Sequence, residues 1–405
     1  MDSAVSFAAR ALMAGKPLEA LDQVALRDDA PALALRGAAM AQLGELPRAR
    51  VLLRRAVGAF SAAERLARAR AELALAEVAF ALREFSVLEG LPGTIAELEA
   101  RGDRGNASHA RLLRSRYLVL CGRLADARSE LDRTPADHAH PLARAIYGLT
   151  QAELSIRAVA ARRAQHELDA ALAAAEALGV HALGAEIRRL RAGLYQPAAR
   201  RWVVDHAVDA DLFAVEEALN SPAVVVNACR REVWYRGACG SFVRRPVLFE
   251  LLVALAKRWP HVVAREELLA AVFGGDERNE SWRERLRVEV GRLRTKFAKF
   301  GGIEPVDGGY RLSVPAPREV RLLLPPFDGE HAAVVALLDD GRPWSSTALA
   351  EALNLSQRSV QRALAELADE GRVYSLGEAR AKRWLIRSSS ETTTALLLPQ
   401  LAGGV

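Results

Sequence analysis

Apolar residues recur at spacings of three and four along residues 1–199, which is the period of an amphipathic helix. Ala, Leu, Arg and Glu dominate this half of the chain, and β-branched and aromatic residues are few. All four of these residue types favour helices. The pattern therefore predicts a domain built from helices over residues 1–199.

Two stretches in this half share one layout. Residues 43–50 read LGELPRAR and residues 121–128 read CGRLADAR, and each follows an apolar helical segment. The glycine is expected to end the first helix in a left-handed conformation, and the small residues allow two antiparallel helices to approach closely. The segments resemble tetratricopeptide repeats. The resemblance implies a solenoid whose concave face suits peptides, partner proteins or small ligands, while a spacer or dimerisation domain is the alternative.

The pattern changes near residue 200. Residues 200–222 are expected to form a linker, and short apolar runs at 223–227 and 232–235 predict strands. Helical spacing follows in three segments and a hairpin closes the region. The three helices are expected at 246–257, 264–272 and 281–300, and the hairpin at 303–312 with its turn at 307–309.

Four collinear segments within residues 223–314 carry a family resemblance. Arg245-Pro246 opens the first helix, VVAREELL occupies 262–269, VEVGRLRTKF occupies 288–297 and GGYRL occupies 308–312. Together they resemble an OmpR/PhoB-type winged-helix DNA-binding domain. The resemblance implies that the helix over 281–300 enters the major groove and that the hairpin is a wing. No receiver domain is expected before it, because residues 1–199 lack alternating strands and helices.

The helix over 281–300 separates an apolar stripe from cationic faces. Leu286, Val290, Leu293 and Phe297 are spaced to form one buried stripe. The resemblance places the first half of the helix in the groove, with later cations at phosphates. The candidate groove residues are Trp282, Arg283, Arg285, Arg287 and Glu289, and the candidate phosphate contacts are Arg292 and Lys296. In the wing, Asp307 stands where the family often has an arginine, so Arg311 is the remaining candidate cation there. A solvated basic helix face is the alternative.

A second module is expected at residues 329–387, after a linker at 315–328 that holds a candidate strand at 320–324. The sequence STALAEALNLSQRSVQRALAELADEGRV at 346–373 resembles the helix-turn-helix of bacterial repressors with a winged-helix fold. Ser345 or Ser346 is expected to cap one helix and Ser356 the next. Leu349, Leu353, Val360, Leu364 and Leu367 are expected to form its core. Residues 388–405 are expected to be a tail.

Polar residues at the start of the second recognition helix are the candidate base readers. Gln and Arg can each make two hydrogen bonds to a purine edge. The candidates are Gln357, Arg358, Ser359, Gln361 and Arg362 on the helix, with Arg380, Lys382 and Arg383 in the wing. The alternative is that this module binds proteins or forms a dimer.

Bulk properties narrow the functional classes. The chain has 405 residues, a net charge of +6 and three cysteines without a CxxC pair, so reduced, packed thiols are expected. It carries no P-loop, GxSxG, HExxH or dinucleotide fingerprint, and no catalytic residues, metal site or cofactor are predicted. Neither a signal peptide nor a membrane-spanning run is visible, and a cytoplasmic, nucleoid-associated protein is expected.

These observations predict a mainly α fold with small β elements, in which a tetratricopeptide-like solenoid precedes two winged-helix domains. The predicted function is a sequence-specific DNA-binding transcriptional regulator. Its expected partners are double-stranded DNA, a second copy in a homodimer and a protein on the repeat domain, with no membrane partner. The alternative is a protein-assembly scaffold in which the repeats and both winged helices bind proteins.

Overall fold

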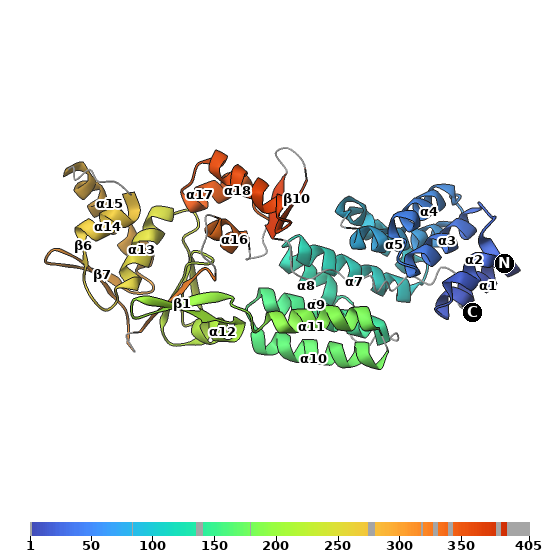
Figure 1. Ribbon diagram of the computed structural model, residues 1–405, viewed down its shortest axis with the longest axis horizontal. Helices are drawn as coiled ribbons and strands as arrows, with labels where there is room; N and C mark the ends of the chain where they lie inside the picture. Colours follow the sequence, from blue (N-terminus) through green and yellow to red (C-terminus); the bar gives the residue numbers. More distant parts are fainter. Residues whose placement is uncertain are drawn as a thin grey trace. The chain divides into compact units, whose positions relative to one another are not determined.

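The computed structural model describes residues 2–82, 84–134, 141–178, 180–273, 280–316, 319–326, 331–338, 343–377 and 382–386. Two compact units divide this chain, one within residues 2–154 and 163–191 and the other within residues 155–162 and 192–386. The described residues are mainly helical with small sheets, as the sequence predicts (Figure 1). None of their helices combines the length and apolarity needed to cross a bilayer.

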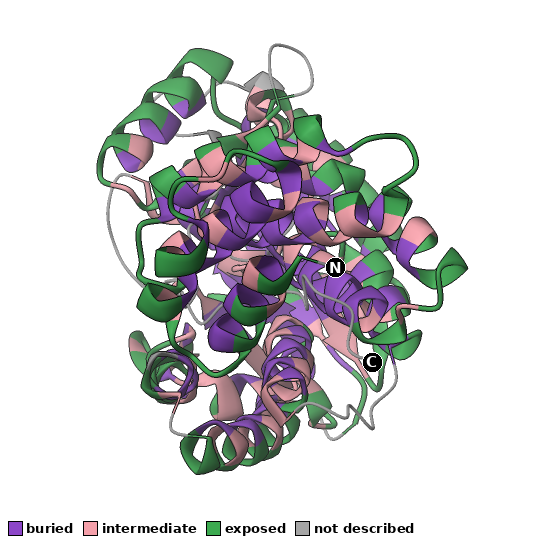
Figure 2. Ribbon diagram, turned by 90° about the vertical axis from the view of Figure 1, so that its right-hand side faces the viewer, coloured by how far each residue is buried: buried purple, intermediate pink, exposed green. Residues whose placement is uncertain are grey.

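Helices make up the first unit. Their bounds are α1 (Ser3–Met13), α2 (Pro17–Val24), α3 (Ala30–Gln42), α4 (Leu46–Ala59), α5 (Arg65–Ala81), η1 (Phe85–Gly90), α6 (Leu91–Ala100), α7 (Arg104–Leu120), α8 (Leu124–Asp132), α9 (Pro141–Arg157), α10 (Ala161–Ala177) and α11 (His181–Gly193). Buried and exposed residues alternate around the helices, as Figure 2 shows. The burial follows the three-and-four spacing of the sequence.

The two similar stretches both form a turn between helices. Gly44 follows α3 with a φ of 81° and Gly122 follows α7 with a φ of 68°, so the predicted left-handed glycines are confirmed. A further glycine permits the close approach of α3 and α4, because a Cβ at Gly37 would lie 2.6 Å from Cγ of Leu53. These are helix–turn–helix pairs. Their assignment as tetratricopeptide repeats stays a prediction.

A buried ion network joins helices of the first unit. Arg116 on α7 donates to Glu186 on α11 at 2.7 Å and lies 3.8 Å from Glu153 on α9. Its guanidinium also lies 5.5 Å from the ring centre of Phe80 on α5. Burial opposes the charge, but the carboxylates of Glu186 and Glu153 outweigh it and raise the pKa of Arg116. The network therefore depends on keeping this cation among its acids.

Strands and shorter helices make up the second unit. Their bounds are β1 (Ala199–Val203), β2 (His206–Ala210), α12 (Leu212–Asn220), β3 (Val224–Asn227), β4 (Glu232–Tyr235), β5 (Ala238–Ser241), α13 (Pro246–Lys257), β6 (Val263–Ala264), α14 (Arg265–Phe273), α15 (Glu280–Phe297), β7 (Gly302–Val306), β8 (Gly309–Ser313), β9 (Val320–Leu324), α16 (Ala332–Leu338), α17 (Ser346–Leu353), α18 (Gln357–Asp369), β10 (Val373–Leu376) and β11 (Arg383–Ile386).

Both segments that the sequence predicts as linkers contribute to one sheet. The strand order is β2-β1-β9-β3-β4-β5, with β9 antiparallel to β1 and parallel to β3. Residues 200–222 hold most of β1, all of β2 and α12, and residues 315–328 hold β9. The linker prediction at 200–222 is corrected, because β1 and β2 form a hairpin there and β1 also pairs with β9. The strand predicted at 320–324 is confirmed as β9. Strands β5 and β6 were also not predicted.

The first module of this unit contains three helices and a small sheet. Helix α13 has the predicted bounds, and the hairpin of β7 and β8 pairs Val306 with Gly309 across Asp307 and Gly308. Strand β6 pairs with β8 and completes the sheet. A Cβ at Gly309 would lie 2.0 Å from the carbonyl oxygen of Val263, so only glycine permits β8 to approach β6 this closely.

The second module packs on the first within the same unit. Helices α16, α17 and α18 and the hairpin of β10 and β11 enclose the predicted core residues, all of which are buried. Val243, which follows β5, packs against this core, and α17 contacts α13. The predicted tail at 388–405 lies outside the described residues.

The buried network gives a test of stability in the first unit. Arg116→Ala leaves Glu186 and Glu153 buried without their cation, and we expect the free energy of unfolding to fall by about 3–5 kcal/mol. The matched control is Arg123→Ala, because the Arg123–Asp126 pair is more than half exposed. Its loss should stay within about 1 kcal/mol. Urea titration followed by helical circular dichroism measures both, and equal small losses would show that the network contributes little.

Candidate nucleic-acid interface

Helix α15 is anchored by the stripe that the sequence predicts. Leu286, Val290, Leu293 and Phe297 are 1%, 1%, 0% and 0% exposed and belong to the core of the first module. The stripe fixes the rotation of the helix about its axis. The burial of this stripe therefore determines which side chains of α15 are exposed to solvent.

One row of polar side chains runs along α15 at positions 285, 289, 292 and 296. The guanidinium of Arg292 donates to the carboxylate of Glu289 at 2.7 Å. Arg285 lies 5.4 Å from the ring centre of Trp282, and Lys296 lies 5.6 Å from that of Phe242. The cations in this row remain exposed while their neighbours restrict their positions.

A second row lies on another side of α15 at positions 283, 287 and 294. Arg294 is held toward the hairpin, because it donates to the carbonyl oxygen of Ile303 at 2.8 Å and lies 5.9 Å from the ring centre of Tyr310. Arg283 and Arg287 are exposed. The spacing therefore separates the candidate groove residues into two rows rather than one patch.

Two residues of α15 differ from the sequence expectation. Only 14% of the Glu289 side chain is exposed and it accepts from Arg292, so its hydrogen-bonding capacity is partly used inside the protein. Val288 is 52% exposed and was not among the candidates. An exposed apolar side chain of this size can contact the methyl group of thymine if the helix lies in a major groove. Its position opposite the buried stripe was the available signal in the sequence.

The hairpin of β7 and β8 presents a weaker cationic surface than α15. Arg311 on β8 donates to Glu304 on β7 at 2.7 Å, and Asp307 is exposed at the turn. The hairpin therefore carries the carboxylates of Glu304 and Asp307 beside the predicted wing cation Arg311. Since Arg311 already has an internal partner, little positive potential is left for a phosphate.

Helix α18 begins with a cap that the sequence predicts. The hydroxyl of Ser356 accepts from the backbone amide of Ser359 at 3.0 Å, and Ser345 caps α17 in the same way. Asn354 has a φ of 56°, so the turn between the two helices uses a left-handed residue. The predicted base readers at 357, 358, 359, 361 and 362 are all exposed.

The hairpin of β10 and β11, in the same module as α18, carries the other predicted cations. Lys382 lies 4.4 Å from the ring centre of Trp384, and Arg383 donates to the carbonyl oxygen of Lys382 at 3.0 Å. Arg380 lies outside the described residues. The structure thus brings the candidates together as two sets, one on each module.

The three cysteines differ in burial, and burial affects the reactivity of a thiol. Cys121 is buried, Cys239 is exposed and all three cysteines are free thiols. Burial raises the pKa of Cys121 to about 11, which disfavours its reactive thiolate. Among the described residues, no cluster of three or more His, Cys, Asp or Glu is arranged to hold a metal ion.

Comparison of the chain with protein-family models, with curated proteins and with solved structures gives no match in any of the three.

The capped helix gives a prediction for the second module. Ser356→Ala removes the acceptor of the Ser359 amide, and we expect the free energy of unfolding of this module to fall by about 1 kcal/mol. Thr347→Ala is the matched control, since Thr347 is exposed on α17 and makes no cap. It should change stability by less than about 0.5 kcal/mol. Hydrogen exchange of α18 amides measures the difference, and unchanged protection in Ser356→Ala would contradict the role of the cap.

Proposed function

We propose that the protein is a sequence-specific DNA-binding transcriptional regulator that uses two winged-helix modules. The observation that carries the proposal is α15, a helix anchored by a buried stripe and lined by exposed cations on two sides. A helix of this kind fits the major groove, and the strand–helix–hairpin order around it supports a winged-helix assignment. The cytoplasm, at the nucleoid, is the proposed location.

The two rows on α15 suit different contacts with a duplex. Arg283 and Arg287 are exposed in the first half of the helix and can donate to guanine edges. Arg292 and Lys296 lie further along and suit phosphates, with Glu289 orienting Arg292. Arg311 contributes less because Glu304 engages it.

Helix α18 supports a second reading surface. Gln357, Arg358 and Gln361 are exposed near its capped start and suit purine edges. Lys382 and Arg383 suit the backbone beside it. In this proposal the helical repeats form a homodimer or bind a partner or ligand that regulates the two modules.

One observation favours a scaffold as the second candidate. Acidic residues hold several of the cations on these surfaces, namely Glu289, Glu304 and Glu366, the last lying 3.7 Å from Arg362. Internally neutralised charges suit a protein interface more than a polyanion. Binding that does not distinguish selected from random duplexes would favour this alternative.

Three substitutions test the division of roles. Random duplexes are selected with the full-length protein, and affinity is then measured for the selected and unselected pools. We expect Arg287→Ala and Arg358→Ala each to weaken the selected duplex by about 1–3 kcal/mol and to relax one base position, because they remove base contacts. Lys296→Ala should weaken both pools alike, because it removes a phosphate contact.

Lys16→Ala is the control, since Lys16 is an exposed cation of the helical repeats. Its affinities should match those of the unmodified protein. Equal losses on both pools for Arg287→Ala and Arg358→Ala would contradict their assignment as base readers.

A further inference from the structure

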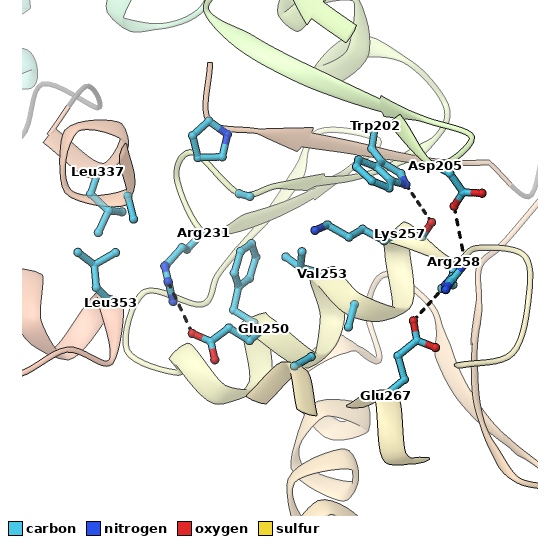
Figure 3. Close-up of a pocket in the computed structure, with 16 residues that line it drawn as sticks. Trp202, Asp205, Arg231, Glu250, Val253, Lys257, Arg258, Glu267, Leu337 and Leu353 are labelled. Atoms are coloured by element: carbon cyan, nitrogen blue, oxygen red, sulfur yellow. Dashed lines mark hydrogen bonds and ion pairs between the residues drawn. The ribbon is translucent and has the colours of Figure 1, made fainter. Parts of the chain in front are cut away.

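A cavity of about 660 Å³ lies inside the second unit, between α13, the large sheet and helices α16 and α17. Its volume falls in the range of small-molecule sites in proteins. Figure 3 shows Arg231 and Glu250 at one part of the cavity and Trp202, Lys257 and Arg258 at another. The walls between them are apolar, with Phe249 and Val253 on α13.

Arg231, which lines this cavity, has a buried donor without a partner among the described residues. Its side chain is 12% exposed, and Nη1 is buried with no hydrogen-bond acceptor in the part of the chain that the structure describes. Glu250 lies 4.0 Å away, too far for a hydrogen bond. The ring centre of Phe249 lies 5.7 Å from the guanidinium. A buried cation with an unsatisfied donor is costly unless an acceptor completes it.

The turn that carries Arg231 holds it in place. Its φ is 53°, an uncommon value for a residue other than glycine, and its carbonyl oxygen accepts from the amide of Phe242 at 2.8 Å. The side chain of Asn227 accepts from the amides of Cys229 and Arg230 and fixes the preceding residues. The backbone is thus built to direct this arginine inward.

The charges of the cavity select the ligand. Arg258 lies 3.7 Å from Asp205 and 3.0 Å from Glu267, and all three side chains are at least 45% exposed, so solvent screens their charges more than that of Arg231. Arg231 and Lys257 then face Glu250 alone, and Lys257 contacts the Trp202 ring 5.1 Å away rather than a carboxylate among the described residues. Burial lowers the pKa of Arg231 and raises the pKa of Glu250, and the attraction between the two charges offsets only part of each shift.

We propose that this cavity binds a small monoanion that has a carboxylate for Arg231 and an aromatic body for the apolar walls. One carboxylate supplies the acceptor that Nη1 lacks and makes a charge-assisted hydrogen bond. The aromatic body packs beside Trp202 and Phe249. A dianion such as a phosphate monoester is disfavoured, since Glu250 lies next to the same guanidinium.

The site also connects the two DNA-binding modules, and this part rests on the proposed function. Phe249 and Glu267 belong to the first module, whereas Leu337 and Leu353 belong to α16 and α17 of the second. A ligand that contacts both sides stabilises one arrangement of the modules over others. Occupancy is therefore expected to change affinity for DNA that both modules contact.

Calorimetry with 2-naphthoate and its neutral analogue 2-naphthamide tests the cavity without DNA. We expect 2-naphthoate to bind the full-length protein with a dissociation constant below about 1 mM, and the amide and 1-naphthyl phosphate to bind at least about tenfold more weakly. Arg231→Met should weaken 2-naphthoate by about tenfold or more. Arg236→Met is the matched control, because Arg236 also has a positive φ but is exposed outside the cavity.

A second variant removes the space and keeps the arginine. Val253→Phe fills the cavity, so 2-naphthoate should no longer bind even if Arg231→Met fails to fold. The proposal is overturned if 2-naphthoate shows no saturable binding, if the amide binds as tightly, or if Arg231→Met and Val253→Phe bind normally.

Affinity for selected DNA is then measured with and without saturating 2-naphthoate. An unchanged DNA affinity would overturn the coupling of the modules. Absence of DNA binding, with intact 2-naphthoate binding, would overturn the proposed function and leave the cavity assignment standing.

Discussion

The pairing of β9 between β1 and β3 is the constraint on which the second unit depends. Val320–Leu324 follows the first module in sequence, yet it pairs with Arg200 and Arg201 on one side and with Val224–Asn227 on the other. Backbone hydrogen bonds across both edges tie the start of the unit to the end of its first module. Pro325, which follows β9, lines the cavity, so the strand also fixes where the chain leaves toward the second module.

This pairing explains which parts of the fold the sequence could predict. The bounds of α13, the buried stripe of α15 and the caps of α17 and α18 follow from local spacing and capping residues. Strands β1 and β2 could not be predicted in this way. Arg200 and Arg201 interrupt the apolar residues of β1, and besides its hairpin with β2 this strand pairs with β9, more than a hundred residues away.

In the candidate interface, too, features that depend on nearby residues were predictable and features that depend on strand pairing were not. Exposure of Arg287, Arg358 and Gln361 was predictable, because each lies on a helix whose apolar face is legible in the sequence. The contact of Arg311 with Glu304 was not, since it crosses a hairpin and depends on register. Val288 was not predicted as a contact residue because it is an isolated apolar residue. Arg231 was not singled out because the sequence holds many arginines.

The proposed recognition surfaces and the cavity lie in one unit. The two modules share contacts through α13 and α17, and the cavity lies against both helices. Arg231, a buried arginine whose Nη1 has no acceptor among the described residues, therefore lies in a cavity that both modules line. The helices of the first unit, joined by the network around Arg116, form a separate compact unit.

Binding of the full-length protein to its own promoter region and to random duplex, titrated across salt, tests the central claim most directly. The account predicts tighter binding to the promoter, with affinity for both duplexes falling steeply as salt rises because phosphate contacts release counterions. Weak binding that is equal on the two duplexes and nearly independent of salt would contradict it.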